Sequence, residues 1–263
     1  MQHVSRPKEA PGILNSAEAK RSRQLMLDFM SLEKGRRSQT SVAHFGIDAA
    51  EPALVQALAA FTNGRCAFCE SVVDLSAHRF RPAGNALPAA SRKDAHLFYV
   101  WLADAWQNPL PICDECRPAE PLFPVEGSRC SLPSPQQVRS YVERGSGLWP
   151  NYPPNERNML IDPSRETGYD RHFTPKLDGT LVSLSPRAAI TFETFRLNRD
   201  VLARRRAAVF EDRLQDLRKL LSSGAGRGER GQRSCTRRRP PTFLMCDGRF
   251  LLGYVLTGSR YQD

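Results

Sequence analysis

The chain has 263 residues, of which 40% are hydrophobic and 25% charged, which is ordinary for a soluble globular protein with one sizeable core. Its 38 Lys and Arg residues outnumber 28 Asp and Glu residues, giving a formal charge of +10. This excess favours polyanionic partners, chiefly nucleic acid, although a solvated basic surface is the alternative. No apolar run approaches the ~20 residues needed to cross a bilayer, which excludes a membrane-spanning protein.

The cysteine content and the N-terminus together indicate a compartment. The first residues, MQHVSRPKEAPG, lack the apolar core of a signal peptide. We therefore expect a cytoplasmic protein, where thiols stay reduced. Its seven cysteines are then better explained as metal ligands and buried thiols than as disulfides.

Residues 1–64 are expected to form an N-terminal helical segment. Ser16 can cap a helix that runs toward Lys34, and Pro52 can open a second helix that Asn63-Gly64 ends. The apolar residues of each helix share one face, namely Leu25, Phe29 and Leu32 in the first and Leu54, Leu58 and Phe61 in the second.

Residues 65–125 are expected to form a second unit, a zinc finger. A short strand is predicted through Val72 and Val73. The segment DAHLFYVWLADAW, residues 94–106, is predicted to be helical, with three apolar side chains facing inward: Leu97, Trp101 and Leu102.

Residues 126–222 are expected to form a third unit of helices and a hairpin. Asp178-Gly179 is typical of a tight turn and joins TPKL to TLVSL as two strands. One long helix is predicted over about 188–222. Residues 223–263 change character, and we interpret them as a Gly/Arg-rich linker followed by a short apolar tail.

Two cysteine pairs carry the strongest chemical signal. Cys66 and Cys69 form one C-x2-C pair, and Cys113 and Cys116 form another. Two such pairs can supply the four sulfur ligands of a tetrahedral zinc ion, and a closed shell of this kind is structural rather than catalytic. The alternative is two unrelated pairs with redox activity.

The cysteine pairs and the residues around them resemble a known family. Two C-x2-C pairs that bracket a His-containing strand resemble the HNH, or ββα-metal, endonuclease finger. RCAFCES, HRFRP, YVWLADAWQN, CDEC and the later FRLNRDVLARRR resemble, in order and spacing over roughly residues 1–215, the HNH proteins of Septu-type and retron-associated anti-phage systems (PtuB-like). The resemblance implies an α+β, mainly helical fold with a zinc-stabilised HNH-like finger inserted between helices, an ATPase partner and a role in phage defence.

The resemblance also implies an active site that this sequence does not reproduce. The family motif is acidic-His-Phe-Arg-Pro, in which the acidic residue helps to hold a divalent ion and His deprotonates water. Aligned on Phe80, the acidic position holds His78 and the base position holds Arg79, which stays protonated. In the other register Arg79 is an insertion and His78 is the base, but Ala77 replaces the carboxylate. Either register removes one essential group.

The family positions near the second pair are also substituted. Arg117 and Glu120 stand where Asn and Lys are expected, whereas Asn108 matches the Asn before the second pair. His78 and Glu120 can both act as metal ligands. The candidate catalytic residues are therefore His78, Asn108 and Glu120.

Three functional hypotheses follow. The first is a catalytically degenerate HNH protein that binds DNA or forms a complex with an ATPase. The second is an active endonuclease that uses His78 with Mg²⁺ or Mn²⁺, and the third is an interaction module without DNA. The candidate nucleic-acid contacts are five arginines: Arg79, Arg81, Arg117, Arg199 and Arg205.

Overall fold

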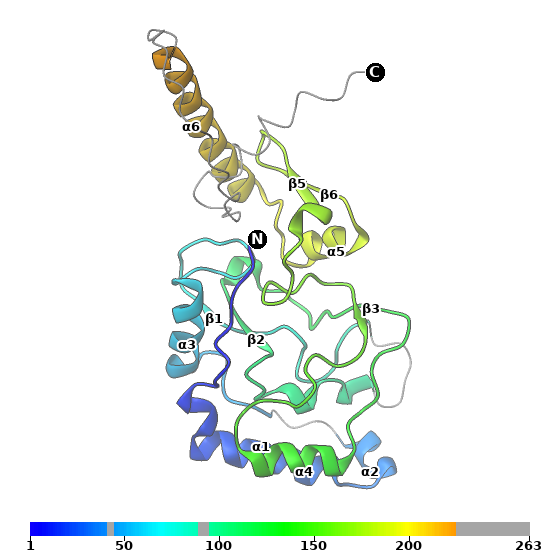
Figure 1. Cartoon of the computed structure of the whole chain (residues 1–263). Coiled ribbons are helices and arrows are strands. Elements are labelled where there is room, and N and C mark those ends of the chain that lie inside the picture. Colours follow the sequence, from blue (N-terminus) through cyan, green and yellow to red (C-terminus); the bar gives the residue numbers. More distant parts are fainter. Residues whose placement is uncertain (41–44, 89–94, 225–263) are drawn as a thin grey trace, which may run out of the picture.

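The computed structural model describes residues 1–40, 45–88 and 95–224 (Figure 1). Within these ranges the chain is an α+β protein with six α-helices and three two-stranded antiparallel sheets. None of the helices in these ranges is long and apolar enough to cross a membrane. The linker and tail predicted for 223–263 lie outside the described residues from 225 onward.

The N-terminal segment contains α1 (Ala17–Met30), α2 (Lys34–Gln39) and α3 (Pro52–Thr62). The predicted starts are confirmed, since Ser16 accepts a hydrogen bond from the Ala19 amide and Pro52 opens α3. α3 ends as predicted at Asn63, whose φ of 53° is left-handed.

The predicted inner face of the first helix is confirmed at Phe29, which is buried, and is wrong at the other two residues. Leu25 and Leu32 are exposed, and α1 instead buries Met26 and Met30 beside the charged Arg23. Arg23 donates a hydrogen bond to the Leu14 carbonyl at 2.7 Å. A charged residue thus occupies the inner face and interrupts the apolar pattern in the sequence. This face lies against α4 at the end of the body opposite α6 (Figure 1).

The central hairpin lies four residues after the predicted strand. Val72 and Val73 are exposed, and β1 (Ser76–Arg79) pairs with β2 (Pro109–Ile112), with His78 opposite Leu110. Before this strand, Glu70 has a φ of 62° and Val72 forms only an isolated bridge with Arg65.

The helix predicted over 94–106 is also wrong. The described part forms two 3-10 turns, Ala95–Leu97 and Val100–Leu102, that meet at Tyr99 with a φ of 67°. The Tyr99 hydroxyl donates to Glu156 at 2.8 Å, so this buried contact overrides the helical pattern. The inward positions were predicted correctly, because Leu97, Trp101 and Leu102 are buried.

The C-terminal part confirms the predicted hairpin and divides the predicted long helix. The Asp178-Gly179 turn joins β5 (Phe173–Pro175) to β6 (Leu181–Ser183). The helix is broken at 195–199, where Arg196 has a φ of 49°. The remaining elements are β3 (Val125–Glu126), α4 (Pro135–Arg144), β4 (Arg157–Asn158), α5 (Pro186–Thr194) and α6 (Asp200–Gly224).

Candidate metal centre

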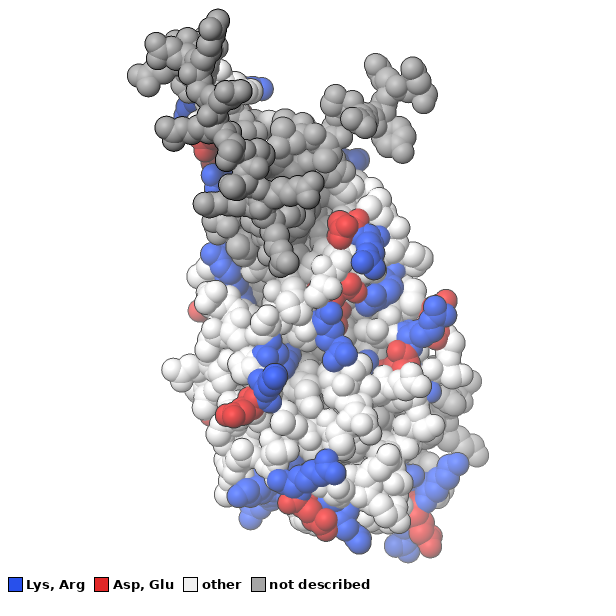
Figure 2. Space-filling view, viewed as in Figure 1, with Lys and Arg blue, Asp and Glu red and all other residues white. Residues whose placement is uncertain are grey.

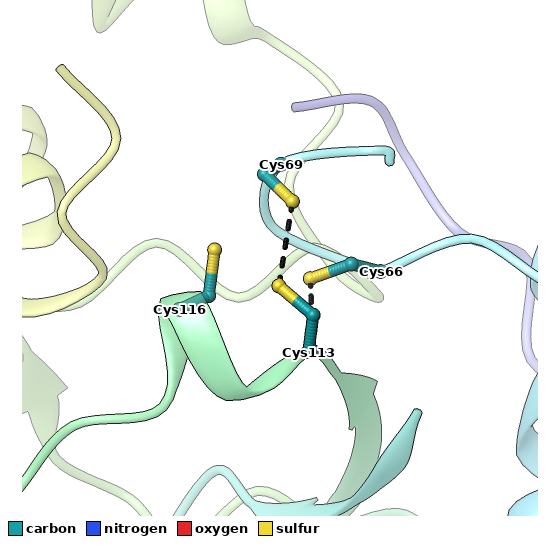
Figure 3. Close-up of side chains that lie close together, drawn as sticks. All are labelled: Cys66, Cys69, Cys113 and Cys116. Carbon is teal, nitrogen blue, oxygen red and sulfur yellow. Dashed lines mark hydrogen bonds between the residues drawn. The ribbon is translucent and has the colours of Figure 1, made fainter. Parts of the chain in front are cut away.

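The four paired cysteines come from two segments that the central hairpin brings together. Cys66 and Cys69 lie in the tight turn after α3, and the Cys66 amide donates to the Ser71 carbonyl at 3.0 Å. Cys113 directly follows β2, and Cys116 ends the 3-10 turn Asp114–Cys116. All four sulfur atoms point into one shared space (Figure 3).

The spacing of these sulfur atoms fits a tetrahedral metal ion. The four Sγ atoms lie within 4.8 Å of one another, and those of Cys69 and Cys113 are 3.6 Å apart. A tetrahedron with metal–sulfur bonds of about 2.3 Å has sulfur–sulfur edges of about 3.8 Å. None of the four is in a disulfide. The cluster can therefore hold a metal ion, and its donor set is that of structural zinc.

Mutual hydrogen bonds separate the four thiols into two kinds. Hydrogen bonding, first with Cys116 and then with Cys66, lowers the pKa of Cys113 to about 6. Hydrogen bonding with Cys113 holds the pKa of Cys69 far below its usual range and raises the pKa of Cys66 and of Cys116. Thiolate is thus favoured at one sulfur of each pair, and thiolate is the form that binds a metal.

The break between α5 and α6 closes over the second cysteine pair. Arg199 donates from Nη1 to the Cys116 sulfur at 3.3 Å. Arg196 donates to the carbonyls of Asp114 and Arg117, both at 3.3 Å. These contacts position the Asp114–Cys116 turn and place a positive charge beside the Cys116 sulfur.

His78 lies beside this centre in an aromatic and basic environment. Its ring contacts Phe68 and Phe195 edge-on at 5.9 and 5.7 Å, and these two rings stack on each other at 3.7 Å. Burial, and then the charges of Arg117 and Arg79, lower the pKa of His78 to about 3. The imidazole is therefore neutral near pH 7.

Arg79 and Arg81 both make hydrogen bonds within the protein, Arg79 from a half-buried and Arg81 from a buried position. Arg79 donates to the carbonyls of Ala103 and Ile47, at 2.8 and 2.6 Å. Arg81 is only 2% exposed and forms an ion pair with Glu156 at 2.9 Å. That these two arginines contact phosphates stays a prediction.

Asn108 is fully buried, and its side chain forms hydrogen bonds with backbone groups. Its Oδ1 accepts from the Arg81 amide, and its Nδ2 donates to the Arg81 carbonyl, both at 2.8 Å. Nδ2 also donates to the Leu102 carbonyl at 3.2 Å. With both amide hydrogens engaged, Asn108 is placed to hold β1 and β2 in register.

The other predicted residues lie at or near the surface. Glu120 is exposed and belongs to no metal-binding cluster within the described residues. Arg117 is half-buried and donates to the Ser76 hydroxyl. Arg205 is exposed and donates to the Ser71 hydroxyl at 3.0 Å. Arg117, Arg199 and Arg205 therefore lie around the cysteine cluster, whereas a shared role of Glu120 and His78 stays a prediction.

The chain is similar to a Septu protein. Over 156 residues it is 28% identical to the Septu protein PtuA of Bacillus mycoides (strain KBAB4). The alignment covers 58% of this chain and 20% of PtuA, so the chain spans about a fifth of the length of that relative. No family model and no solved structure matches the chain. The likeness agrees with the Septu part of the resemblance and does not support the PtuB-like part.

Three residues build the surroundings of this centre, and of these the sequence predicted a role for Arg199 alone, as a nucleic-acid contact. Phe195, which packs on His78, and Arg196 and Arg199, which contact the second cysteine pair, all lie in the break between α5 and α6. They are about 80 residues from the cysteines they serve and carry no spacing signal of their own. The motif FRLNRD was noticed only as part of the family resemblance.

Proposed function

We propose that this chain is a zinc-stabilised subunit of a Septu-type anti-phage defence system that no longer cuts DNA. In this proposal the β1–β2 hairpin with its four cysteines is an HNH-like finger kept as a scaffold, which binds DNA or assembles with an ATPase. The observation that carries it is the cysteine cluster, the single group of three or more Cys, His, Asp and Glu side chains placed to hold a metal among the described residues.

The surroundings of His78 favour a degenerate site over an active one. The nearby charges of Arg117 and Arg79, which lower the pKa of the His78 imidazole, also oppose a divalent cation there. Asn108 is engaged with the backbone, and Glu120 belongs to no metal-binding cluster of the described residues. Zinc held by four thiolates would cross-link the two cysteine segments and leave no open position for water.

Charge distribution supports binding rather than cleavage as the contribution of the finger. Arg117, Arg199 and Arg205 surround the cysteine cluster. On the face shown in Figure 2, Lys and Arg side chains lie in several separate groups, many of them beside acidic residues. We therefore infer a limited phosphate-contacting surface near the metal centre rather than a continuous DNA-binding groove.

Metal content tests the first part of this proposal. The purified chain should contain about one zinc ion, measured by elemental analysis. Cys116→Ser should lose it, whereas Cys130→Ser should keep it, because Cys130 is a half-buried thiol outside the cluster. Retention of full zinc content by Cys116→Ser would overturn the four-cysteine site.

Plasmid nicking and DNA binding separate the three hypotheses. With Mg²⁺ or Mn²⁺, alone and with its ATPase partner, the chain should leave plasmid DNA intact. Nicking that His78→Ala abolishes would instead establish the active endonuclease. Duplex DNA should bind with an affinity that decreases as salt increases, and Arg205→Gln together with Arg117→Gln should weaken it. Negligible binding at low salt would leave the interaction module without DNA.

A further inference from the structure

Helix α6 carries an apolar stripe with the repeat of a coiled coil. Apolar residues recur at alternating steps of four and three positions over five successive intervals. Such a repeat averages 3.5 residues and keeps the apolar side chains on one narrow seam. The seam consists of Ala203, Ala207, Phe210, Leu214, Leu217 and Leu221.

The inner end of this seam already acts as a packing face. The turn between β5 and β6 rests on it so closely that a Cβ at Gly179 would overlap the Ala203 carbonyl, and Arg206 donates to the Gly179 carbonyl at 3.2 Å. Further along, Phe210 and Leu202 line a cavity of about 260 Å³ beside Cys69. The stripe therefore seats α6 on the body for its first three turns.

The outer end continues the same seam beyond the body. α6 projects away from the rest of the chain (Figure 1). Leu214 and Leu217 are only partly buried, and Leu221 is 76% exposed. Leucines in register with a packed face but extending past it are typical of a helix that binds a second helix.

The residues that flank the seam indicate the charge of that second helix. In a coiled coil these flanking positions face the partner and select it by charge. Of the six flanking residues four are basic, one is acidic and one, Leu220, is apolar. If two copies paired in parallel, Arg213 of one would face Arg218 of the other, which disfavours a second copy, whereas the attractive pair of Arg206 with Glu211 involves an arginine that already contacts Gly179. The flanking residues are Arg204, Arg206, Glu211, Arg213, Arg218 and Leu220.

We propose that the outer half of α6 docks an acidic amphipathic helix of a partner protein. Its leucines would pack on Leu214, Leu217 and Leu221, and its flanking carboxylates would face Arg213 and Arg218. The leucine seam favours a protein helix over nucleic acid, which would use only the arginines. This proposal rests on the complex-forming part of the proposed function and names the chemistry of the partner, whereas it requires neither the metal nor DNA.

A synthetic helix tests the docking surface directly. The probe is a fluorescent peptide of roughly four heptads with Leu at the seam positions and Glu at all flanking positions, which repel one another and prevent self-pairing. A matched peptide carries Lys at the flanking positions. The full chain should bind the Glu peptide in an anisotropy titration, at least about tenfold more tightly than the Lys peptide.

Variants of α6 separate the seam from general effects of charge. Leu214→Glu with Leu221→Glu should weaken binding of the Glu peptide at least about tenfold. Ala208→Glu with Gln215→Glu adds the same charge at exposed positions off the seam and should leave binding nearly unchanged. Should the seam variant fold poorly, Arg213→Glu with Arg218→Glu keeps every leucine and should reverse the preference toward the Lys peptide.

The other occupants are recognised by different outcomes. Equal binding of both peptides, or of neither, overturns the proposal. A dimer in sedimentation analysis that Leu221→Glu dissociates would assign the seam to a second copy. Duplex DNA binding lost in Arg213→Glu with Arg218→Glu, but kept in the leucine variant, would assign the arginines to nucleic acid. Zinc content is measured in parallel, so that a failure of the docking proposal can be distinguished from a failure of the proposed metal centre.

Discussion

At the scale of a single residue, Asn108 links the end of β1 to the start of β2. Removing its side chain leaves the Arg81 amide and the Arg81 carbonyl without their partner and takes one of two hydrogen bonds from the Leu102 carbonyl. We expect Asn108→Ala to lower the free energy of unfolding by roughly 1–3 kcal/mol, measured by urea denaturation. Asn155→Ala, at an exposed position, should change it by less than about 0.5 kcal/mol. Equal effects of the two substitutions would contradict a structural role for Asn108.

His78 should remain neutral far below the ordinary pKa of a histidine. Because burial and two arginines lower its pKa to about 3, the unfolded chain binds a proton between pH 6.5 and 3 that the folded chain does not. The contribution of His78 thus makes folding less favourable as pH decreases through that window and has no effect above it. In an NMR titration the His78 imidazole should show no protonation down to about pH 4.

A matched variant isolates this contribution from other acid effects. The loss of unfolding free energy between pH 7 and pH 4 should be smaller in His78→Gln than in the unsubstituted chain. His3→Gln removes an exposed histidine and serves as the control. An imidazole that titrates near 6.5 would show that water and counterions reach His78.

At the scale of elements, the β5–β6 turn and α6 depend on a glycine. Gly179 has a φ of 81°, and a Cβ there would overlap the backbone of Ala203. Gly127 has a similar φ of 78° with no atom near its missing Cβ, so it isolates the backbone effect. Gly127→Ala should lower the free energy of unfolding by about 1–2 kcal/mol. Gly179→Ala should lower it by several kcal/mol more, measured in urea. Similar losses in the two variants would show that the turn moves off α6 easily.

Element boundaries could be predicted from the sequence wherever a local signal sets them. Ser16, Pro52, Asn63 and the Asp178-Gly179 turn each act through their own backbone or cap, so they needed no knowledge of the fold. The predictions failed where contacts between residues far apart in the sequence determine the local conformation. Tyr99 is held by Glu156, 57 residues away, in a conformation that breaks the expected helix.

The same distinction applies to the candidate site. Cysteine spacing predicted the four-cysteine cluster because each pair lies within one turn of chain. The break between α5 and α6, by contrast, was predicted as continuous helix. The residues around Arg196 give no sign that its side chain contacts the carbonyls of Asp114 and Arg117. The arginines of HRFRP were predicted as nucleic-acid contacts, since nothing in the neighbouring sequence indicates that Arg81 pairs with Glu156.

At the scale of the whole molecule, the cysteine cluster joins three distant segments. It links the turn after α3 to the turn after β2, and Arg199 attaches the start of α6 to Cys116. The stacked Phe68 and Phe195 extend this junction into the main core. Because a metal bound only in the folded state stabilises it by mass action, zinc should contribute to the stability of all three segments together.

Metal removal should therefore destabilise the whole body rather than one loop. Free zinc at about 100 times its dissociation constant should raise the free energy of unfolding by about 2.7 kcal/mol, and a chelator should reverse the gain. Circular dichroism and tryptophan fluorescence should report the same transition, since Trp101 and Trp106 are buried away from the cysteines. Cys116→Ser should lose the dependence on zinc and Cys130→Ser should keep it. If chelation changed stability in neither the unsubstituted chain nor Cys130→Ser, the cysteine cluster would be a packed group of thiols and not a metal cross-link.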